Sequence, residues 1–514
     1  MALWDLHNTF PTELLSEIFL HLIVSPPSSS PTPTNTIHHP LLVSHVCSHW
    51  RTAALATPRL WARLFIQLGI SKAESQAALV NTWMERSGGC SLTVYVFWED
   101  PPFASSHPVL ECLLKHSVRW KEMFFYLPFN VFRRFGKVAG KVPLLTELSL
   151  GTDTDTQDII LQMFKSAPKL ASLECVNLSP FFFTFPWQNL TNIPIMAVTI
   201  EECLSILHQA TSLQKAGFIF LTTSSTTANT TSARGLRPIH HPSLTHLSIL
   251  TSPWDESIDL TPLFPLLSLP KLISLTICNL KSHFGTAGFT SFLSRLYSLR
   301  TLHLRKTALS DQNLVAGLRV VPTVEKLVVH PLIEGLGPPS VTDVVFDELR
   351  WKKEGDDDDE GSDGDFTARR KRRNSGLPLL PKLTSIEVKL DNAIADAFIH
   401  MIHSRRTSVH FPTKPYRYRK ATSSHGEEEG KASGLVVAAE DGDEGDDGNG
   451  EEDEIDKPSI LEHVRIRFSE PLHPQFISEF EDLQRDGLRI ELDYMNENGG
   501  IEFVRHSSLP FDTR

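Results

Sequence analysis

The chain has 514 residues, of which 41% are hydrophobic, and a formal net charge of −12. That length exceeds what one compact core usually holds, so several domains or one elongated array of repeats is expected. No apolar run approaches the roughly 20 residues that a membrane helix needs, and the N-terminus lacks the features of a secretory signal, which predicts a protein of the cytoplasm or nucleus.

Short amphipathic helices are predicted at the N-terminus. The first begins at Pro11, because the missing N–H of proline leaves nothing unpaired in a first helical turn. Its apolar residues form one stripe at helical spacing: Leu14, Leu15, Ile18, Phe19 and Leu22. A second helix carries Val43, Val46, Cys47 and Trp50. Thr57-Pro58 then has the form of a helix start and presents Leu60 and Trp61.

This region resembles an F-box. The segments FPTELLSEIFLHLI and LLVSHVCSHWRTAALATPRLW join Pro-x-Glu-Leu-Leu-x-x-Ile-Phe to Val-Cys-x-x-Trp-Arg and Pro-x-Leu-Trp, in that order. The pattern is similar to that of the large F-box-like families of mushroom-forming fungi, as is the Trp-x-x-Arg-Ser-Gly-Gly stretch that begins at Trp83. Two features depart from the family: Phe10-Pro11 replaces the usual Leu-Pro, and a Ser/Pro/Thr-rich loop at 24–40 interrupts the helices. We expect an F-box over residues 8–66.

The resemblance implies the substrate receptor of an SCF-type ubiquitin ligase. An F-box docks on the Skp adaptor, which links it to a cullin and a RING protein. The chain itself would perform no bond chemistry, and it would promote ubiquitin transfer by holding a protein substrate near the conjugating enzyme. One set of residues would form the core of the box and its contact with the adaptor: Pro11, Leu14, Leu15, Ile18, Phe19, Leu22, Val43, Val46, Trp50, Leu60 and Trp61.

A repeated phrase, Pro-x-Leu-x-x-Leu-x-Leu, follows the helices. Its variants include PLLTELSL, PKLASLECVNL, PSLTHLSIL and PKLISLTICNL. The first apolar positions are Leu145, Leu170, Leu244, Leu272, Leu299, Val324 and Leu383. Regular copies lie 25 to 28 residues apart, which is the spacing of leucine-rich repeats. Because one repeat cannot bury its apolar face alone, neighbouring repeats must stack into a curved solenoid.

The expected fold class is therefore α/β: a small all-α F-box followed by a leucine-rich-repeat solenoid. Repeats are expected at 71–350 and 377–420, and the last repeats and a cap at 458–514. Strands are predicted at 91–97 and 120–126. Helices are predicted between later strands, at 155–166, 199–210, 286–295, 310–320, 391–405 and 474–487. Residues 181–221 do not match the repeat regularly.

Two charged insertions interrupt the predicted solenoid, at 352–376 and 421–457. Both are rich in Asp and Glu and poor in apolar residues, a composition typical of disorder. The first also holds a basic run from Arg369 to Arg373. This run has two interpretations, a nuclear localisation signal or a simple counterbalance to the acidic residues before it. Nucleic-acid binding is less favoured, because the adjacent acidic residues would repel phosphates.

The sequence predicts no enzyme active site. The glycine-rich phosphate loops, the Gly-x-Ser-x-Gly elbow and His-Glu-x-x-His are all missing. The six cysteines are scattered without a Cys-x-x-Cys pair, so neither a metal site nor a cofactor is predicted. One alternative is an enzyme whose site lies in the irregular region 181–221. Another is a repeat scaffold without ligase association, whose N-terminal helices only cap the solenoid.

The inner face of the solenoid is predicted to become basic towards the C-terminus. If residues between the repeat leucines point outward, the late repeats present His303, Arg305, Lys326, His330, Lys389, Arg465 and Arg467. Arginine pairs well with carboxylates and phosphates, so these residues are candidates for binding an acidic or phosphorylated protein substrate. The alternative is a solvated strand face without a partner.

Overall fold

The structure is a computed structural model of the whole chain, and thirteen ranges of it are described. These are residues 10–22, 39–98, 106–153, 159–221, 238–251, 258–278, 286–331, 341–351, 379–390, 392–406, 459–468, 472–495 and 501–502. The predicted insertions at 352–376 and 421–457 lie outside these ranges, together with the basic run Arg369 to Arg373 and most of the loop at 24–40.

One long sheet runs through the molecule. In the described residues it has 15 strands, which follow one another in chain order and are parallel except for the last pair. The strands are β1 (Arg63–Gln67), β2 (Leu92–Phe97), β3 (Trp120–Tyr126), β4 (Glu147–Gly151), β5 (Ser172–Val176), β6 (Asn192–Val198), β7 (Lys215–Phe220), β9 (His246–Thr251), β11 (Ser274–Cys278), β12 (Thr301–Thr307), β13 (Lys326–Pro331), β14 (Ser385–Lys389), β15 (His463–Phe468), β16 (Arg489–Met495) and β17 (Ile501–Glu502). A separate short pair joins β8 (Ile239–His240) to β10 (Leu267–Ser268).

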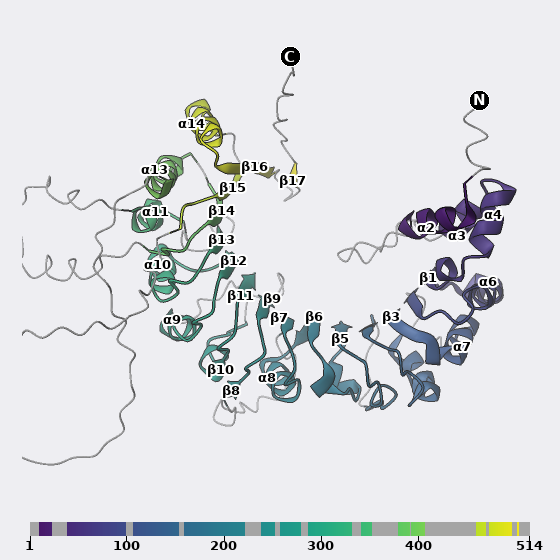
Figure 1. Cartoon of the computed structure of the whole chain (residues 1–514). Helices are drawn as coiled ribbons and strands as arrows, with labels where there is room; N and C mark the ends of the chain where they lie inside the picture. Colours follow the sequence, from purple (N-terminus) through teal and green to yellow (C-terminus); the bar gives the residue numbers. More distant parts are fainter. Residues whose placement is uncertain are drawn as a thin grey trace, which may run out of the picture.

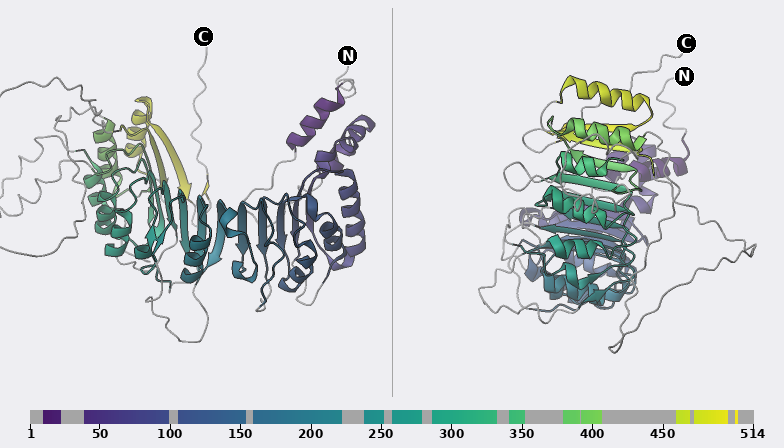
Figure 2. Two further views of the ribbon diagram at one scale, coloured as in Figure 1. Left: turned by 60° about the horizontal axis from the view of Figure 1, so that its bottom comes forward. Right: turned by 90° about the vertical axis from the view of Figure 1, so that its left-hand side faces the viewer.

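The molecule is a horseshoe, with strands along its inner edge and helices along its outer edge (Figure 1). The outer layer contains α6 (Ala73–Arg86), α7 (Pro108–Lys115), α8 (Ile200–Gln209), α9 (Thr286–Leu293), α10 (Asp311–Arg319), α11 (Asp343–Leu349), α13 (Ala395–Arg406) and α14 (Pro474–Arg485). Short 3₁₀ turns also occur in the connections between strands: η1 (Ile70–Lys72), η2 (Ser117–Arg119), η3 (Phe129–Val138), η4 (Pro180–Phe182), η5 (Trp187–Asn189) and η7 (Phe264–Leu266). The two layers stack regularly when viewed from the side (Figure 2).

The repeat leucines hold the two layers together. The first apolar residue of every repeat phrase is fully buried: Leu145, Leu170, Leu244, Leu272, Leu299, Val324 and Leu383 are each 0% exposed. In each strand the following apolar residues also face the helices, since alternate residues of a strand point to opposite faces. The described residues therefore form a mixed α/β solenoid with a long parallel sheet, as the repeat phrase predicts.

Two parts of the chain differ from the sequence-based expectation. The predicted helix at 155–166 is wrong for its described part, because residues 159–166 form turns and a bridge between Leu161 and Phe183 instead. The irregular region at 181–221 contains two strands, β6 and β7, with a shift in their register. Gly217 permits this shift, because a side chain there would collide with the carbonyl oxygen of Pro194.

The N-terminal helices are joined directly to the sheet. They are α2 (Thr12–Leu22), α3 (His39–Ser44), α4 (Ser48–Leu55) and α5 (Pro58–Trp61). Only one residue separates α5 from β1, which pairs with β2 in parallel. The predicted domain boundary at residue 66 thus falls inside a strand, and the sheet begins earlier than the repeat phrase indicates. These helices stand at one tip of the horseshoe, and α14 stands at the other (Figure 1).

Candidate functional site

The inner side of α2 packs on the other N-terminal helices. Leu15 and Phe19 are buried, and the ring of Phe19 lies 5.0 Å from the half-buried ring of Trp50 on α4, centroid to centroid. The hydroxyls of Ser16 and Thr57 are 2.7 Å apart and join α2 to the start of α5. These contacts fix the rotation of α2 about its own axis, and this rotation decides which of its apolar residues face solvent.

The outer side of α2 carries an exposed apolar stripe. Leu14, Ile18 and Leu22 follow one another at one-turn spacing, and they are 52%, 44% and 47% exposed. On α3 and the turn after it, Leu42 and Val46 are 61% and 59% exposed. We call these five residues the outer stripe. Contiguous exposed apolar surface on a folded protein commonly marks a site of protein–protein contact.

The eleven residues predicted to form the box and its adaptor contact separate into two groups. The inner group is buried or half-buried and consists of Leu15, Phe19, Val43, Trp50, Leu60 and Trp61. The outer group is exposed and consists of Pro11, Leu14, Ile18, Leu22 and Val46. Leu42, which the sequence analysis did not single out, lies one helical turn before Val46 and is exposed as well. The sequence pattern alone could not separate these groups, because neighbouring stripe residues alternate between them.

Trp61 connects the N-terminal helices to the solenoid. Its fully buried ring lies 4.8 Å from the ring of Trp83 on α6, at an edge-on angle of 71°. The guanidinium carbon of Arg86 lies 4.4 Å from the centre of the same ring, and the indole nitrogen donates a 2.9 Å hydrogen bond to the carbonyl oxygen of Ala54. Trp83 and Arg86, from the Trp-x-x-Arg stretch noted in the sequence, therefore form the surface on which Trp61 packs.

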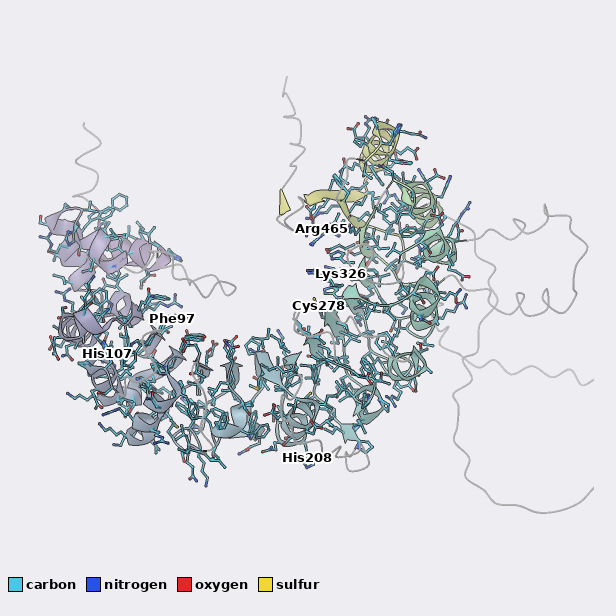
Figure 3. All side chains as sticks on the ribbon, turned by 180° about the vertical axis from the view of Figure 1, so that it is seen from behind. Phe97, His107, His208, Cys278, Lys326 and Arg465 are labelled. Carbon is cyan, nitrogen blue, oxygen red and sulfur yellow. The ribbon has the colours of Figure 1, made fainter. Side chains whose placement is uncertain are left out.

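The second candidate surface is the concave face of the sheet, where strand register aligns the side chains in rows. In the late repeats Arg305 is in register with His330, and Lys389 is in register with Arg467. A further row contains His303 and Arg465. Lys326 begins β13 in a third row. Cys278, Lys326 and Arg465 lie along the inner edge of the horseshoe, whereas His208 lies on the outer side (Figure 3). All seven residues predicted to bind substrate thus come from adjacent strands, β12 to β15.

Three carboxylates that the sequence analysis did not single out lie among these cations. The Oε1 atom of Glu387 is 3.0 Å from Nη2 of Arg467 and 3.6 Å from Nη2 of Arg305. The same oxygen is 3.0 Å from Nε2 of His330. Glu387 itself is buried, so this carboxylate neutralises part of the charge that the cations place on the concave face.

Asp493 and Glu491 of β16 extend the network. Nε of Arg465 donates a 2.7 Å hydrogen bond to Oδ2 of Asp493, and Nε2 of His463 lies 3.4 Å from Oε1 of Glu491. The late concave face is therefore a mixed network of ion pairs. No salt bridge among the described residues joins Lys326 or Lys389, so these two lysines keep their charge available for a partner.

Burial and the neighbouring charges set the protonation states in this network. Burial alone would raise the pKa of Glu387, but the contact with His330 and the nearby guanidinium groups lower it to about 2. Burial, with Arg305 and Lys326 nearby, lowers the pKa of His303 to about 4. Burial also lowers the pKa of His330. Both histidines are therefore neutral at pH 7, and the positive charge of this face comes from arginine and lysine.

We expect acid to weaken this network through Glu387. Since its folded-state pKa is depressed from 4.5 to about 2, its contribution to stability is complete above pH 4.5 and is lost as the pH falls towards 2. The wild type should exceed Glu387→Gln by about 3 kcal/mol in free energy of unfolding at pH 6. Denaturant titrations of both proteins between pH 3 and pH 6 would show the difference shrinking with acid. A difference independent of pH would contradict this assignment.

The early concave face has a different character, which the sequence analysis missed. Half-buried aromatic rings from three adjacent strands stack on one another there, and we call them the aromatic ladder: Phe65, Tyr95, Phe97, Phe124 and Tyr126. The rings of Tyr95 and Phe124 are 4.1 Å apart and inclined by 7°. A partial signal was present in the sequence, because Tyr95 and Phe97 alternate with valine in SLTVYVF and three consecutive aromatic residues follow Met123 in MFFY. Phe97 marks this surface in Figure 3.

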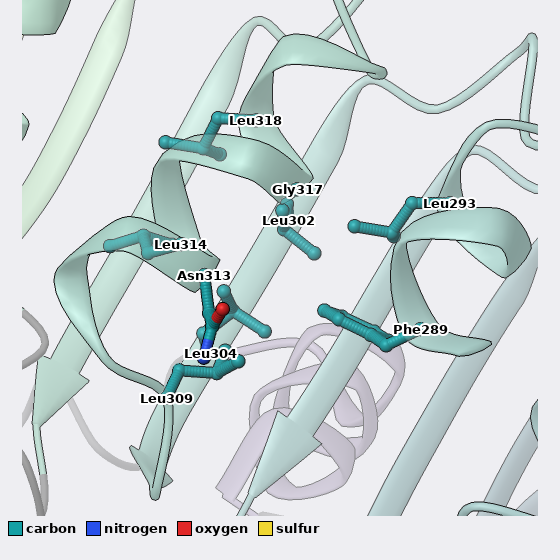
Figure 4. A pocket seen from close by; sticks show the side chains of 9 residues that line it. All are labelled: Phe289, Leu293, Leu302, Leu304, Leu309, Asn313, Leu314, Gly317 and Leu318. Atoms are coloured by element: carbon teal, nitrogen blue, oxygen red, sulfur yellow. The ribbon is translucent and has the colours of Figure 1, made fainter. Parts of the chain in front are cut away.

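The helical layer contains a small apolar gap between α9 and α10 (Figure 4). It is lined by Phe289, Leu293, Leu302, Leu304, Leu309, Asn313, Leu314, Gly317 and Leu318. Asn313 is the one polar side chain of this lining, so the gap is a packing seam between two repeats and lacks the convergent polar groups of a ligand site. Within the described residues, no group of three or more His, Cys, Asp or Glu side chains could hold a metal ion. Among the same residues, no helix is both long and apolar enough to cross a membrane.

Comparisons with known proteins add little beyond this geometry. No protein-family model matches the chain, and no curated protein matches its sequence. One solved structure that it matches is a crystal structure of a TLR13–ssRNA13 complex, at 12% identity and a TM-score of 0.24. That match covers 60% of this chain and 44% of the other one. The assignment of a repeat solenoid therefore rests on the sheet, the register and the buried repeat leucines described above.

Proposed function

We propose that this chain is the substrate receptor of an SCF-type ubiquitin ligase, and that it docks on the Skp adaptor through its N-terminal helices. The observation that supports this most directly is the outer stripe. The order of motifs resembles an F-box, and within that region the five apolar residues of the outer stripe are exposed and are not used by the core. A stripe of this kind gains stability when a partner covers it, because its burial removes apolar surface from water.

In this proposal the chain performs no bond chemistry. The N-terminal helices bind the adaptor at one tip of the horseshoe, and the concave face binds a protein substrate. Ubiquitin transfer is then promoted because the substrate is held near the conjugating enzyme. Lys326 and Lys389 are suited to an acidic or phosphorylated segment of the substrate, since the carboxylates of the ion-pair network leave them unpaired among the described residues.

The test is co-purification of the full chain with a Skp-type adaptor. We expect the wild type to bind and Ile18→Asp to lose binding by a hundredfold or more, because a carboxylate would be buried at the centre of an apolar contact. Ile18 is 44% exposed in the free chain, so the substitution should leave the fold intact. Circular dichroism of the free variant checks that the repeats remain folded.

A matched control distinguishes the outer stripe from apolar surface in general. Val344 on α11 is 50% exposed and belongs to the outer helical layer, so Val344→Asp should bind the adaptor as the wild type does. If the folded wild type does not bind the adaptor, the proposal is wrong. Equal binding by the wild type and Ile18→Asp would also contradict it.

The alternative is a protein-interaction scaffold without ligase association. One observation favours it: the N-terminal helices run directly into β1, and Trp61 is buried against Trp83 of the first outer helix. Such helices also shield the apolar end of a solenoid, which terminal repeats must do in any repeat protein. A folded chain that binds no adaptor would favour this scaffold.

A further inference from the structure

The aromatic ladder ends abruptly on β3. Tyr95 covers one face of the Phe124 ring, and the residue in register with Phe124 on the next strand is Ser149. Among the described residues no aromatic ring covers the second face of Phe124, which is directed towards β4. Gly151 follows in the neighbouring row, and a Cβ atom there would lie 2.5 Å from Cδ2 of Tyr126. The Tyr126 ring therefore lies over Gly151. Beside the second face of Phe124, β4 presents only the small side chain of Ser149, and we call the space above Ser149 the gap.

A carboxylate borders this gap on its other side. Glu174 of β5 is in register with Ser149, and the Ser149 hydroxyl donates a 2.8 Å hydrogen bond to Oε2 of Glu174. Because adjacent strands are about 4.8 Å apart, β3 and β5 are separated by about 10 Å. The Glu174 carboxylate leans over Ser149, so a flat cationic group on the second face of the Phe124 ring would lie above Ser149 and within reach of that carboxylate.

The surrounding charges favour a cation there. Glu122 and Glu147 occupy the adjacent row and are directly in register, an arrangement of like charges that is unfavourable on neighbouring strands. Lys121 pairs with Glu122 at 2.8 Å, but no salt bridge among the described residues joins Glu147. A bound cation would relieve this repulsion. The same carboxylates would repel the phosphates of a nucleic acid.

We propose that this end of the concave face binds an extended peptide segment through an arginine or lysine side chain, which packs on the free face of Phe124 and pairs with Glu174. An aromatic face attracts a cation through its quadrupole, and a partly desolvated carboxylate adds an ion pair. Arginine suits the gap best, because its guanidinium is planar and can stack on the ring while it donates to the carboxylate. The inference rests on the proposed receptor function only where the bound peptide is called a substrate. Binding of the peptide itself does not depend on that function.

The test measures peptide binding to the full chain in the absence of the adaptor. The probe is a fluorescein-labelled decapeptide of alternating arginine and serine, followed by fluorescence anisotropy, and the comparison peptide replaces every arginine with the neutral analogue citrulline. We expect the arginine peptide to bind at least tenfold more tightly. Phe124→Leu and Glu174→Gln should each weaken its binding about fivefold, and neither should change binding of the citrulline peptide.

A matched control accounts for the overall acidity of the chain. Glu85→Gln removes one exposed carboxylate from α6, on the outer side of the same end of the molecule, and it should bind the arginine peptide as the wild type does. The acidic runs at 354–365 and 427–456 are present in every variant, so any contribution they make is constant. Unchanged affinity in both Phe124→Leu and Glu174→Gln, or equal binding of the two peptides, would overturn the proposal. Because the assay contains no adaptor, its outcome does not depend on whether the chain binds the adaptor.

Discussion

Replacing Arg405 with methionine should destabilise the C-terminal repeats by about 4 kcal/mol or more. Arg405 is completely buried near the end of α13. Its guanidinium donates to three backbone carbonyl oxygens, at 2.8 Å to Leu349, 3.1 Å to Leu380 and 2.5 Å to Leu379. Methionine has similar length but no donor, so three buried carbonyls would lose their partner, at about 1–3 kcal/mol each.

The position of these carbonyls explains why one residue matters so much. Leu349 ends α11 before the predicted insertion at 352–376, whereas Leu379 and Leu380 follow it. Arg405 therefore joins the chain segments before and after the insertion to α13. It also stabilises Leu380, whose φ of 53° is left-handed and costs a non-glycine residue about 1 kcal/mol. Burial lowers the pKa of Arg405 to about 9, so the side chain remains charged at pH 7.

Hydrogen exchange would locate the effect. Because repeats are stabilised mainly by their neighbours, Arg405→Met should accelerate exchange in β14, β15 and α13 and leave β1 to β7 unchanged. Arg406→Met is the matched comparison, since Arg406 donates to the carbonyls of Leu461 and Asp486 at a more exposed position, and its loss should cost only about 1 kcal/mol. Equal effects of the two substitutions would show that burial of the Arg405 bonds is unimportant.

The repeat architecture was predictable because each strand repeats the same physical requirement. A fully buried leucine such as Leu272 or Leu299 must recur once per turn of the solenoid, so the sequence displays it at constant spacing. Arg405 gives no comparable signal, because its carbonyl partners lie 25, 26 and 56 residues away in the chain. A single arginine at a helix end is usually a solvated residue, and only the folded path of the chain shows otherwise.

The candidate surfaces were predictable only in part. The stripe on α2 was evident from its spacing, but the division into buried Leu15 and exposed Ile18 depends on where α4 packs. Lys389 was identified in the phrase PKLTSIEVKL, whereas Glu387, two residues earlier on the same face, was overlooked as an isolated acid. Its importance follows from its contacts with Arg305, His330 and Arg467 on three other strands, which no local pattern reveals.

Replacing Trp61 with alanine should separate the N-terminal helices from the solenoid. Trp61 is 0% exposed and Trp83 is 2% exposed, so the substitution leaves a large cavity at their contact and costs about 4 kcal/mol. We expect rapid hydrogen exchange throughout α2, α4 and α5, with the sheet beyond β3 unaffected. Trp61→Phe retains most of the ring contact but not the hydrogen bond to Ala54, so it should cost about 1–2 kcal/mol.

Trp61→Ala and Ile18→Asp should both abolish adaptor binding, but for different reasons. Trp61→Ala should abolish adaptor binding because the outer stripe is no longer presented on a folded helix, even though Trp61 is itself inaccessible to a partner. Ile18→Asp should abolish binding while hydrogen exchange in α2 stays slow. If Trp61→Ala left exchange in the N-terminal helices unchanged, the seam with Trp83 and Arg86 would not stabilise them. The outer stripe would then owe its orientation to the contacts of α2 with α4 and with Thr57 at the start of α5.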